Sequence, residues 1–145
     1  PLPPGAIPQY AHLVHDIRPG EGPLAALEAG LGSAHDDVLL VAAGDMPWLE
    51  PAILDLLVER LESTPSADRA CLVLEDQPQP FPMACRRAPT LAHVTMLLDD
   101  GERRLRSILD GPATLTIPHA DWRHLDPDGR SLRDIDTPAD LASAG

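Results

Sequence analysis

Residues 36–51 read DDVLLVAAGDMPWLEP, and this segment says more about the architecture than any other part of the chain. Residues 38–43 are all apolar, a run far shorter than the roughly 20 residues of a membrane span. A short run of this kind predicts a strand that is apolar on both faces, as in a parallel sheet covered by helices on each side. Gly44 and Asp45 are expected to end the strand, and Pro51 to open a helix.

Helical and strand patterns alternate on both sides of this segment. We expect a strand at 12–15, a helix from Pro23 that ends near Gly30 and Gly32, a helix at 51–61, a strand at 71–74, helices at 90–98 and 102–109, a strand at 115–118, and a last helix that Thr137 caps and Pro138 begins. This alternation predicts an α/β fold, a three-layer α/β/α sandwich with a mainly parallel sheet. Residues 1–145 are expected to form a single domain.

The composition excludes some classes of protein. The net charge of -12, from 11 Lys plus Arg against 23 Asp plus Glu, opposes binding to nucleic acid. The acidic surplus serves solubility more often than it gathers Mg²⁺. Cys71 and Cys85 form no metal-ligand spacing and are expected to be free and packed. We expect a cytoplasmic protein with no membrane partner, a monomer or a weak homo-oligomer.

Asp45 is the first candidate for chemistry, because it follows the most apolar strand. In open α/β sheets, ligands bind at the carboxyl ends of the strands. A carboxylate near an apolar core is costly unless something compensates its charge, and a bound cation would do so. From these residues alone, Asp45 could equally cap a neighbouring helix or turn.

Asp134 and Asp136 supply a second acidic pair near the end of the chain. Residues two apart lie on the same side of an extended backbone. Mg²⁺ takes one or two carboxylates with water and phosphate oxygens, so Asp45 and Asp136 would suffice as protein ligands. The alternative is that Asp136 stabilises the start of the following helix through its dipole.

Two glycine-containing segments complete the candidates. Asp16 and residues 20–24 precede a helix, where glycines allow backbone amides to approach a ligand and the helix points its positive end at it. Alone, such a stretch predicts only a turn. Asp126 and Gly129 are likewise better explained by a turn than by a calcium loop, because the other calcium ligands are missing.

The order and spacing of five segments resemble the MobA-like nucleotidyltransferases, a family that includes molybdenum cofactor guanylyltransferases and their cytidylyltransferase relatives. The segments are DIRPGEGPLAALEAGL (16–31), VLLVAAGDMPWL (38–49), QPQPFPMACRR (77–87), LLDDGERRLRSIL (97–109) and SLRDIDTPADL (131–141). The resemblance implies a Rossmann-like sandwich and an enzyme that transfers GMP or CMP from GTP or CTP to a molybdopterin acceptor, releasing pyrophosphate.

The resemblance also implies roles for single residues. Asp45 would be the catalytic residue that binds Mg²⁺ and nucleotide. The nucleotide would further contact Asp16 and the turn at Gly22, Pro23 and Leu24. Asp136 would share the metal, whereas the acceptor would contact Asp134, Gln79 and Arg86.

One part of the family pattern has no counterpart in these residues. The resemblance implies a preceding strand and a glycine-rich loop of the form LAGGxSxRMGxxK, so we expect the domain to lack this segment here. Either roughly 40 to 60 residues precede Pro1, or the chain is a degenerate relative. Two alternatives therefore remain: transfer to another small phosphorylated acceptor, such as a phospholactate or a sugar phosphate, or a catalytically inactive module that binds or regulates through the same fold.

Overall fold

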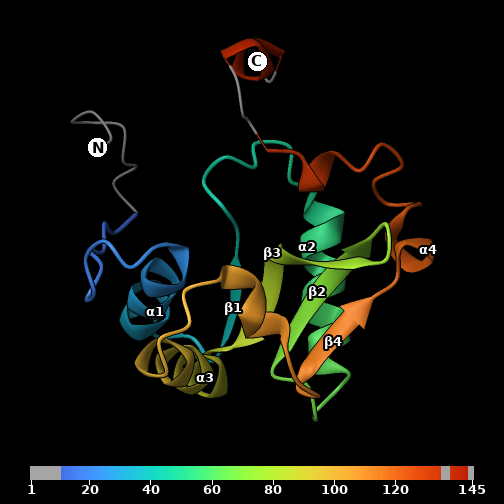
Figure 1. The fold of residues 1–145 in the computed structure, drawn as a ribbon. Helices are drawn as coiled ribbons and strands as arrows, with labels where there is room; N and C mark the ends of the chain where they lie inside the picture. The colour runs from blue at the N-terminus through green and yellow to red at the C-terminus, as the bar shows by residue number, and fades with distance from the viewer. Residues whose placement is uncertain (1–10, 135–137, 144–145) are drawn as a thin grey trace.

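The computed structural model describes residues 11–134 and 138–143. Its elements in chain order are α1 (Pro23–Ser33), β1 (Val38–Val41), α2 (Pro51–Glu62), β2 (Arg69–Leu74), β3 (Gln77–Arg86), α3 (Arg87–Asp99), the 3₁₀ helix η1 (Leu105–Leu109), β4 (Thr114–Ile117), α4 (His119–Trp122), the 3₁₀ helix η2 (Arg130–Leu132) and α5 (Pro138–Ser143). Figure 1 shows α1 and α3 side by side, next to a central sheet. None of the described helices is long and apolar enough to cross a membrane.

The α/β fold expected from the sequence is confirmed, with one open sheet in the order β1-β3-β2-β4. The sheet is more mixed than predicted. Strand β3 runs antiparallel to both β1 and β2, and only the β2–β4 pairing is parallel. Strands β1, β2 and β4 therefore share one direction, and β3 alone opposes them.

The reversed strand follows from a two-residue turn. Glu75 and Asp76 both have a left-handed backbone, with φ of 49° and 60°, and Leu74 pairs with Gln77 across the turn. Two consecutive residues with positive φ make the tight turn that suits a β-hairpin. A hairpin forces β3 to run back along β2. Strand β1 pairs with the other edge of β3, so β3 lies between β2 and β1.

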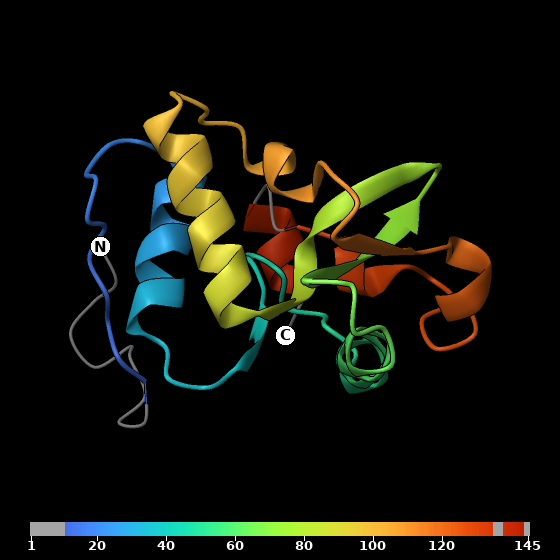
Figure 2. The same ribbon diagram turned by 90° about the horizontal axis from the view of Figure 1, so that it is seen from below.

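Two apolar clusters fill the spaces on either side of the sheet, as a three-layer sandwich requires. On one side Met83 and Cys85 of β3 pack with residues of α1, α3 and η1. On the other side Ala84 packs with α2 and with the fully buried Trp122, whose indole Nε1 donates to Val73 O at 3.2 Å. Neighbouring residues of β3 thus point to opposite clusters, as the alternation of side chains along a strand dictates. Figure 2 shows α1 and α3 together on one side, with α2 away from them.

The helices on each side begin where the sequence places prolines. Pro23 is the first residue of α1 and Pro51 the first residue of α2, as predicted. Helix α1 runs through Gly30 and ends at Ser33, one residue beyond Gly32, so the expected end at these glycines is nearly right. Leucines of α1, among them Leu24 and Leu31, are buried. Their packing stabilises the helix at its glycines.

Three other expectations for local structure need correction. Residues 12–15 are irregular and exposed, not a strand, and residues 102–104 are irregular, with only Leu105–Leu109 forming a 3₁₀ helix. The third concerns β1, which was expected to be covered on both faces. Leu39 and Val41 pack against the cluster under α1, whereas Leu40 is 46% exposed.

Candidate functional site

The start of α1 and the end of β1 meet at one cleft. The cleft has a volume of about 490 Å³ and lies between the helix and the strand. Its walls include Pro23, the first residue of α1, and Ala42 and Ala43, which directly follow β1. The two segments that the sequence singled out for ligand binding are therefore neighbours in space, although they are about 20 residues apart in the chain.

Gly22 gives the turn before α1 a conformation that other residues rarely adopt. Its φ is 84° and its ψ is -168°, and it is the N-cap residue of the helix. This region of backbone space is accessible essentially to glycine alone. No side chain caps the helix, no acidic residue lies in its first turn, and Pro23 has no N–H group. The exposed start of α1 therefore keeps its positive end available for an anion.

Leu24 was predicted to contact the nucleotide, and its burial limits how it can do so. The side chain is fully buried in the cluster beneath α1. Leu24 can therefore face a ligand at the helix start with its backbone N–H but not with its side chain. Asp16 lies six residues before Gly22, in the irregular segment that leads to the turn, and is half-buried.

Asp45 lies in the connection between β1 and α2 and is exposed. Among the described residues, its carboxylate accepts no hydrogen bond and forms no ion pair, so the alternative in which Asp45 caps a helix or turn has no support in the contacts of this region. Mg²⁺ needs only one or two carboxylates and completes its shell with water and phosphate oxygens. A single open carboxylate at a strand end fits that requirement. No three His, Cys, Asp or Glu side chains of residues 11–134 and 138–143 form a denser metal site.

The C-terminal tail reaches the connection that carries Asp45. Glu50 donates its backbone N–H to Ser131 Oγ at 3.0 Å, which joins the start of α2 to η2. Ser131 is fully buried, and its own N–H donates to Asp126 Oδ2 at 2.8 Å. Asp126 is thus a buried turn-capping residue, as expected from the sequence.

Asp134 follows η2 and is exposed. It therefore lies close to the joined segments. Asp136, the second predicted metal ligand, lies outside the described residues, so its pairing with Asp45 stays a prediction.

Two of the three residues predicted to contact the acceptor, Gln79 and Arg86, lie at different ends of β3. Gln79 is beyond the end of β1, on the side where Asp45 follows that strand, and its amide donates to Gln77 O at 3.0 Å. Arg86 pairs with Val38 at the opposite end. Its guanidinium donates to Ala67 O and to Leu61 O, both at 3.0 Å. Arg86 therefore holds the connection after α2, and the structure does not bring it together with Asp45.

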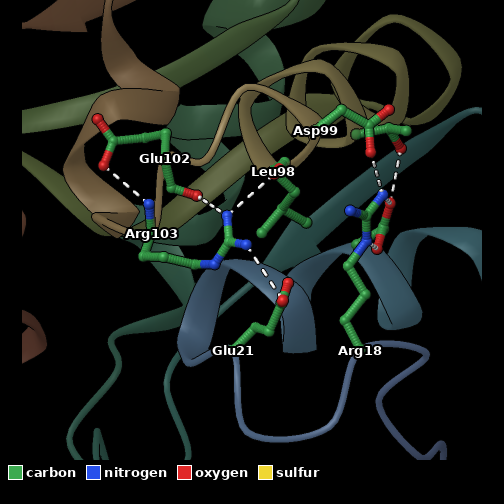
Figure 3. A network of polar contacts seen from close by, with 8 residues as sticks. Arg18, Glu21, Leu98, Asp99, Glu102 and Arg103 are labelled. Atoms are coloured by element: carbon green, nitrogen blue, oxygen red, sulfur yellow. Dashed lines mark hydrogen bonds and ion pairs between the residues drawn. The ribbon is translucent and has the colours of Figure 1, made fainter.

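A network of charged side chains fastens the segment before α1 to the end of α3 (Figure 3). Arg18 Nη2 lies 2.6 Å from Asp99 Oδ1, and Arg18 Nε lies 3.0 Å from Glu28 Oε2. Arg103 Nη2 lies 3.1 Å from Glu21 Oε1. Hydrogen bonds to Asp99 and then to Glu28 raise the pKa of the Arg18 guanidinium.

The sequence analysis did not identify this network, and no simple pattern would have found it. Arg18 and Glu28 are 10 residues apart, and Arg18 and Asp99 are 81 apart. Charge pairs are readable from sequence when they recur three or four residues apart on one helix. Pairs that span two helices and a loop require the tertiary structure. The one available signal was Glu28, an acidic residue among the leucines of α1.

The sequence and fold both match proteins of one family. A family model described as MobA-like NTP transferase domain matches residues 5–118. A protein of Chloroflexus aggregans named "Probable molybdenum cofactor guanylyltransferase" is 33% identical over 131 residues, which are 90% of this chain and 62% of that protein. A protein of the same name from Natronomonas pharaonis is 30% identical over 130 residues, 89% of this chain and 62% of that protein. The chain thus spans less than two thirds of the length of these relatives.

A solved structure supports the same relationship. The molybdopterin-guanine dinucleotide biosynthesis protein A of Archaeoglobus fulgidus matches with a TM-score of 0.71 and 25% sequence identity, over 85% of this chain and 60% of that one. A protein of Aquifex aeolicus matches with a TM-score of 0.59 and 16% identity, which shows the fold alone.

Proposed function

The chain belongs to the family of MobA-like NTP transferase domains, and from this premise we propose that the protein transfers GMP from GTP to a molybdopterin-type acceptor. A phosphate oxygen of the acceptor attacks the α-phosphorus of GTP, the bond to the bridging oxygen of the β-phosphate breaks, and pyrophosphate leaves. Such a transfer depends on alignment and charge neutralisation more than on covalent help from the protein. The relatives described above carry guanylyltransferase names, which favours GTP over CTP.

The observation that carries the proposal is the meeting of two segments at one end of the sheet. The start of α1 and the end of β1 border the same cleft, and Asp45 follows two residues beyond Ala43. We propose that the turn at Gly22 binds phosphate oxygens with backbone N–H groups, because the uncapped helix start favours negative charge. Asp16, in the segment leading to that turn, would contact the nucleotide.

Asp45 would hold Mg²⁺, with Asp136 as the proposed second ligand. The ion supplies charge neutralisation for the phosphate groups of the nucleotide. The remaining task of the chain is to orient the two reactants. Gln79 and Asp134, which lie towards this end of the molecule, are the proposed contacts to the acceptor.

The test is pyrophosphate release from GTP by the complete protein in the presence of the molybdopterin acceptor and Mg²⁺. Asp45→Ala is expected to lower the rate at least about a hundredfold, the scale seen when one electrostatic group of an active site is removed. Asp55→Ala is the matched control, because Asp55 is likewise an exposed aspartate but lies on α2, outside the connection that carries Asp45. Undiminished release by Asp45→Ala would end this assignment.

The same assay separates the alternatives to this reaction. Offering a phospholactate or a sugar phosphate in place of the pterin tests for another acceptor. Titrating GTP and Mg²⁺ into the protein by calorimetry tests for an inactive module, which would give no heat of binding.

A further inference from the structure

The turn at Arg18–Glu21 is held at one end by the last residue of α3 and at the other by the segment just after that helix. Glu21 donates its backbone N–H to Arg18 O at 3.3 Å, which closes the turn. The first residue, Arg18, pairs with Asp99 at the end of α3, and the last residue, Glu21, pairs with Arg103 just beyond it. We call these two ion pairs the α3 clamp (Figure 3).

The two halves of the clamp have different anchors. Arg18 also pairs with Glu28, whose side chain is only 8% exposed and which receives a further hydrogen bond from Thr95 Oγ1 at 2.9 Å. Removing Arg18 would leave a buried carboxylate without its cation, which destabilises the fold as a whole. This half of the clamp is therefore part of the packing between α1 and α3.

The half formed by Arg103 serves the turn itself. Arg103 Nη1 donates to Leu98 O at 2.9 Å and to Glu102 O at 2.8 Å, so the guanidinium is fixed at the C-terminal end of α3, where a cation is favoured by the helix dipole. Its Nη2 is thereby aimed at Glu21. The other oxygen of Glu21, Oε2, is shielded from solvent and accepts no hydrogen bond among the described residues. Without Arg103 this carboxylate would turn towards water and draw the turn with it.

Glu21 immediately precedes Gly22, so a shift of Glu21 alters the start of α1 directly. Asp16 lies two residues before Arg18, on the other side of the turn. The clamp therefore lies between the two positions that the proposed function assigns to nucleotide binding.

We infer that Arg103 is a positioning residue, which holds the turn through Glu21 in the arrangement that contacts the nucleotide. The identity of the ligand rests on the proposed function, whereas the α3 clamp rests on the ion pairs described above. Arg103 acts only through Glu21 and touches no substrate. Its loss should weaken nucleotide binding without affecting the catalytic step, because a turn that binds ground state and transition state alike contributes to KM and not to kcat.

The experiment is a double-mutant cycle with Glu21→Gln, Arg103→Gln and the double variant in the complete protein. Each single variant is expected to weaken GTP binding, measured by calorimetry, about threefold to fivefold, the scale of a partly exposed ion pair. The double variant is expected to bind no more weakly than either single variant, because both remove one interaction. kcat should stay within about twofold, and the melting temperature should change little.

Amide hydrogen exchange of the peptide covering residues 16–24 provides a readout that needs no ligand. Exchange in this peptide is expected to quicken by a similar factor in all three variants, with no change in α2 or β2. Arg104→Gln is the matched control, because Arg104 pairs with Glu102 in the same connection, is 80% exposed and does not reach the turn.

The outcomes separate the two proposals. If wild-type protein binds GTP and the variants bind it equally well, Arg103 is no positioning residue. Unchanged exchange in residues 16–24 would also overturn the inference. If wild-type protein binds no GTP, the proposed function fails, while the exchange data still show whether the clamp holds the turn.

Discussion

The backbone N–H of Glu50 donates to the hydroxyl of Ser131 at 3.0 Å, across 81 residues of sequence. This contact joins the connection that carries Asp45 to the segment that leads into the acidic tail. Ser131 is fully buried.

Replacing Ser131 by Ala should therefore loosen the join. The substitution leaves the Glu50 N–H without its acceptor, and we expect a loss of about 1–2 kcal/mol in the free energy of unfolding. Urea unfolding followed by circular dichroism measures it. Ser63→Ala is the control, because the Ser63 hydroxyl donates to Glu59 O at an exposed helix end. Equal losses for the two variants would show that the contact to Glu50 contributes nothing of its own.

The two glycines Gly22 and Gly32 should respond to alanine with opposite signs. Neither position has an atom within 4 Å of an added Cβ, so sterics with neighbours do not differ. Gly22 has a φ of 84°, and alanine there should cost about 1–3 kcal/mol. Gly32 lies in the last turn of α1, where alanine should stabilise by up to about 0.5 kcal/mol, less than in the middle of a helix. Thermal unfolding of both variants gives the comparison, and a stable Gly22→Ala protein would argue against a strained turn.

Cys71 and Cys85 should resist thiol reagents in the folded protein. Burial, the main cause, raises the pKa of each thiol from an ordinary 9.0 to about 11. A rise of two units lowers the thiolate fraction at pH 8 about a hundredfold, and only the thiolate reacts. Iodoacetamide at pH 8 should therefore modify neither thiol in buffer and both in 8 M urea, as read by mass spectrometry. Rapid modification of the native protein would contradict the burial.

Folding stability should decrease in mild acid because of His93. Desolvation, and then the nearby charge of Arg69, lower the pKa of its imidazole in the folded state, with weaker opposing effects from Ser107, Asp110 and Asp68. The unfolded chain therefore takes up a proton first. The contribution of His93 is full above the unfolded pKa of about 6.5 and is lost as the pH falls through the lower folded value.

Urea unfolding at pH 7.5 and pH 5.5 measures this effect for wild type and for His93→Gln. The variant should lose less stability between the two pH values than wild type does. His35→Gln, at an exposed position, should behave as wild type. Identical pH dependence of wild type and His93→Gln would exclude His93 as the cause.

The sequence predicted those elements whose pattern depends on local composition. The run at 38–43 indicated β1, and Pro23 and Pro51 marked the starts of α1 and α2. It did not predict β3, because residues 77–86 contain Pro78, Pro80 and Pro82, and proline is normally excluded from central strands. The structure reconciles these facts. All three prolines precede Met83, where the pairing with β1 begins, so among the described strands this part of β3 pairs with β2 alone.

The candidate site was predictable to a similar degree. That Asp45 follows β1 and that Gly22 directly precedes α1 could be inferred from spacing, because each position is set by its own element. The join between Glu50 and Ser131 and the clamp at Arg103 could not, since each depends on how two distant segments pack. The sequence therefore predicted where the elements begin and end. The hydrogen bonds and ion pairs that connect those ends to distant segments required the structure.

The positions of the two tryptophans make the protein its own reporter. Trp122 is fully buried in the apolar cluster between the sheet and α2. Its emission should therefore change only when this cluster unfolds. Trp48 is half-buried and lies three residues after Asp45, in the connection between β1 and α2. Replacing either one with phenylalanine would leave a single tryptophan, so that denaturation and local events beside Asp45 could be followed separately by tryptophan emission without an extrinsic dye.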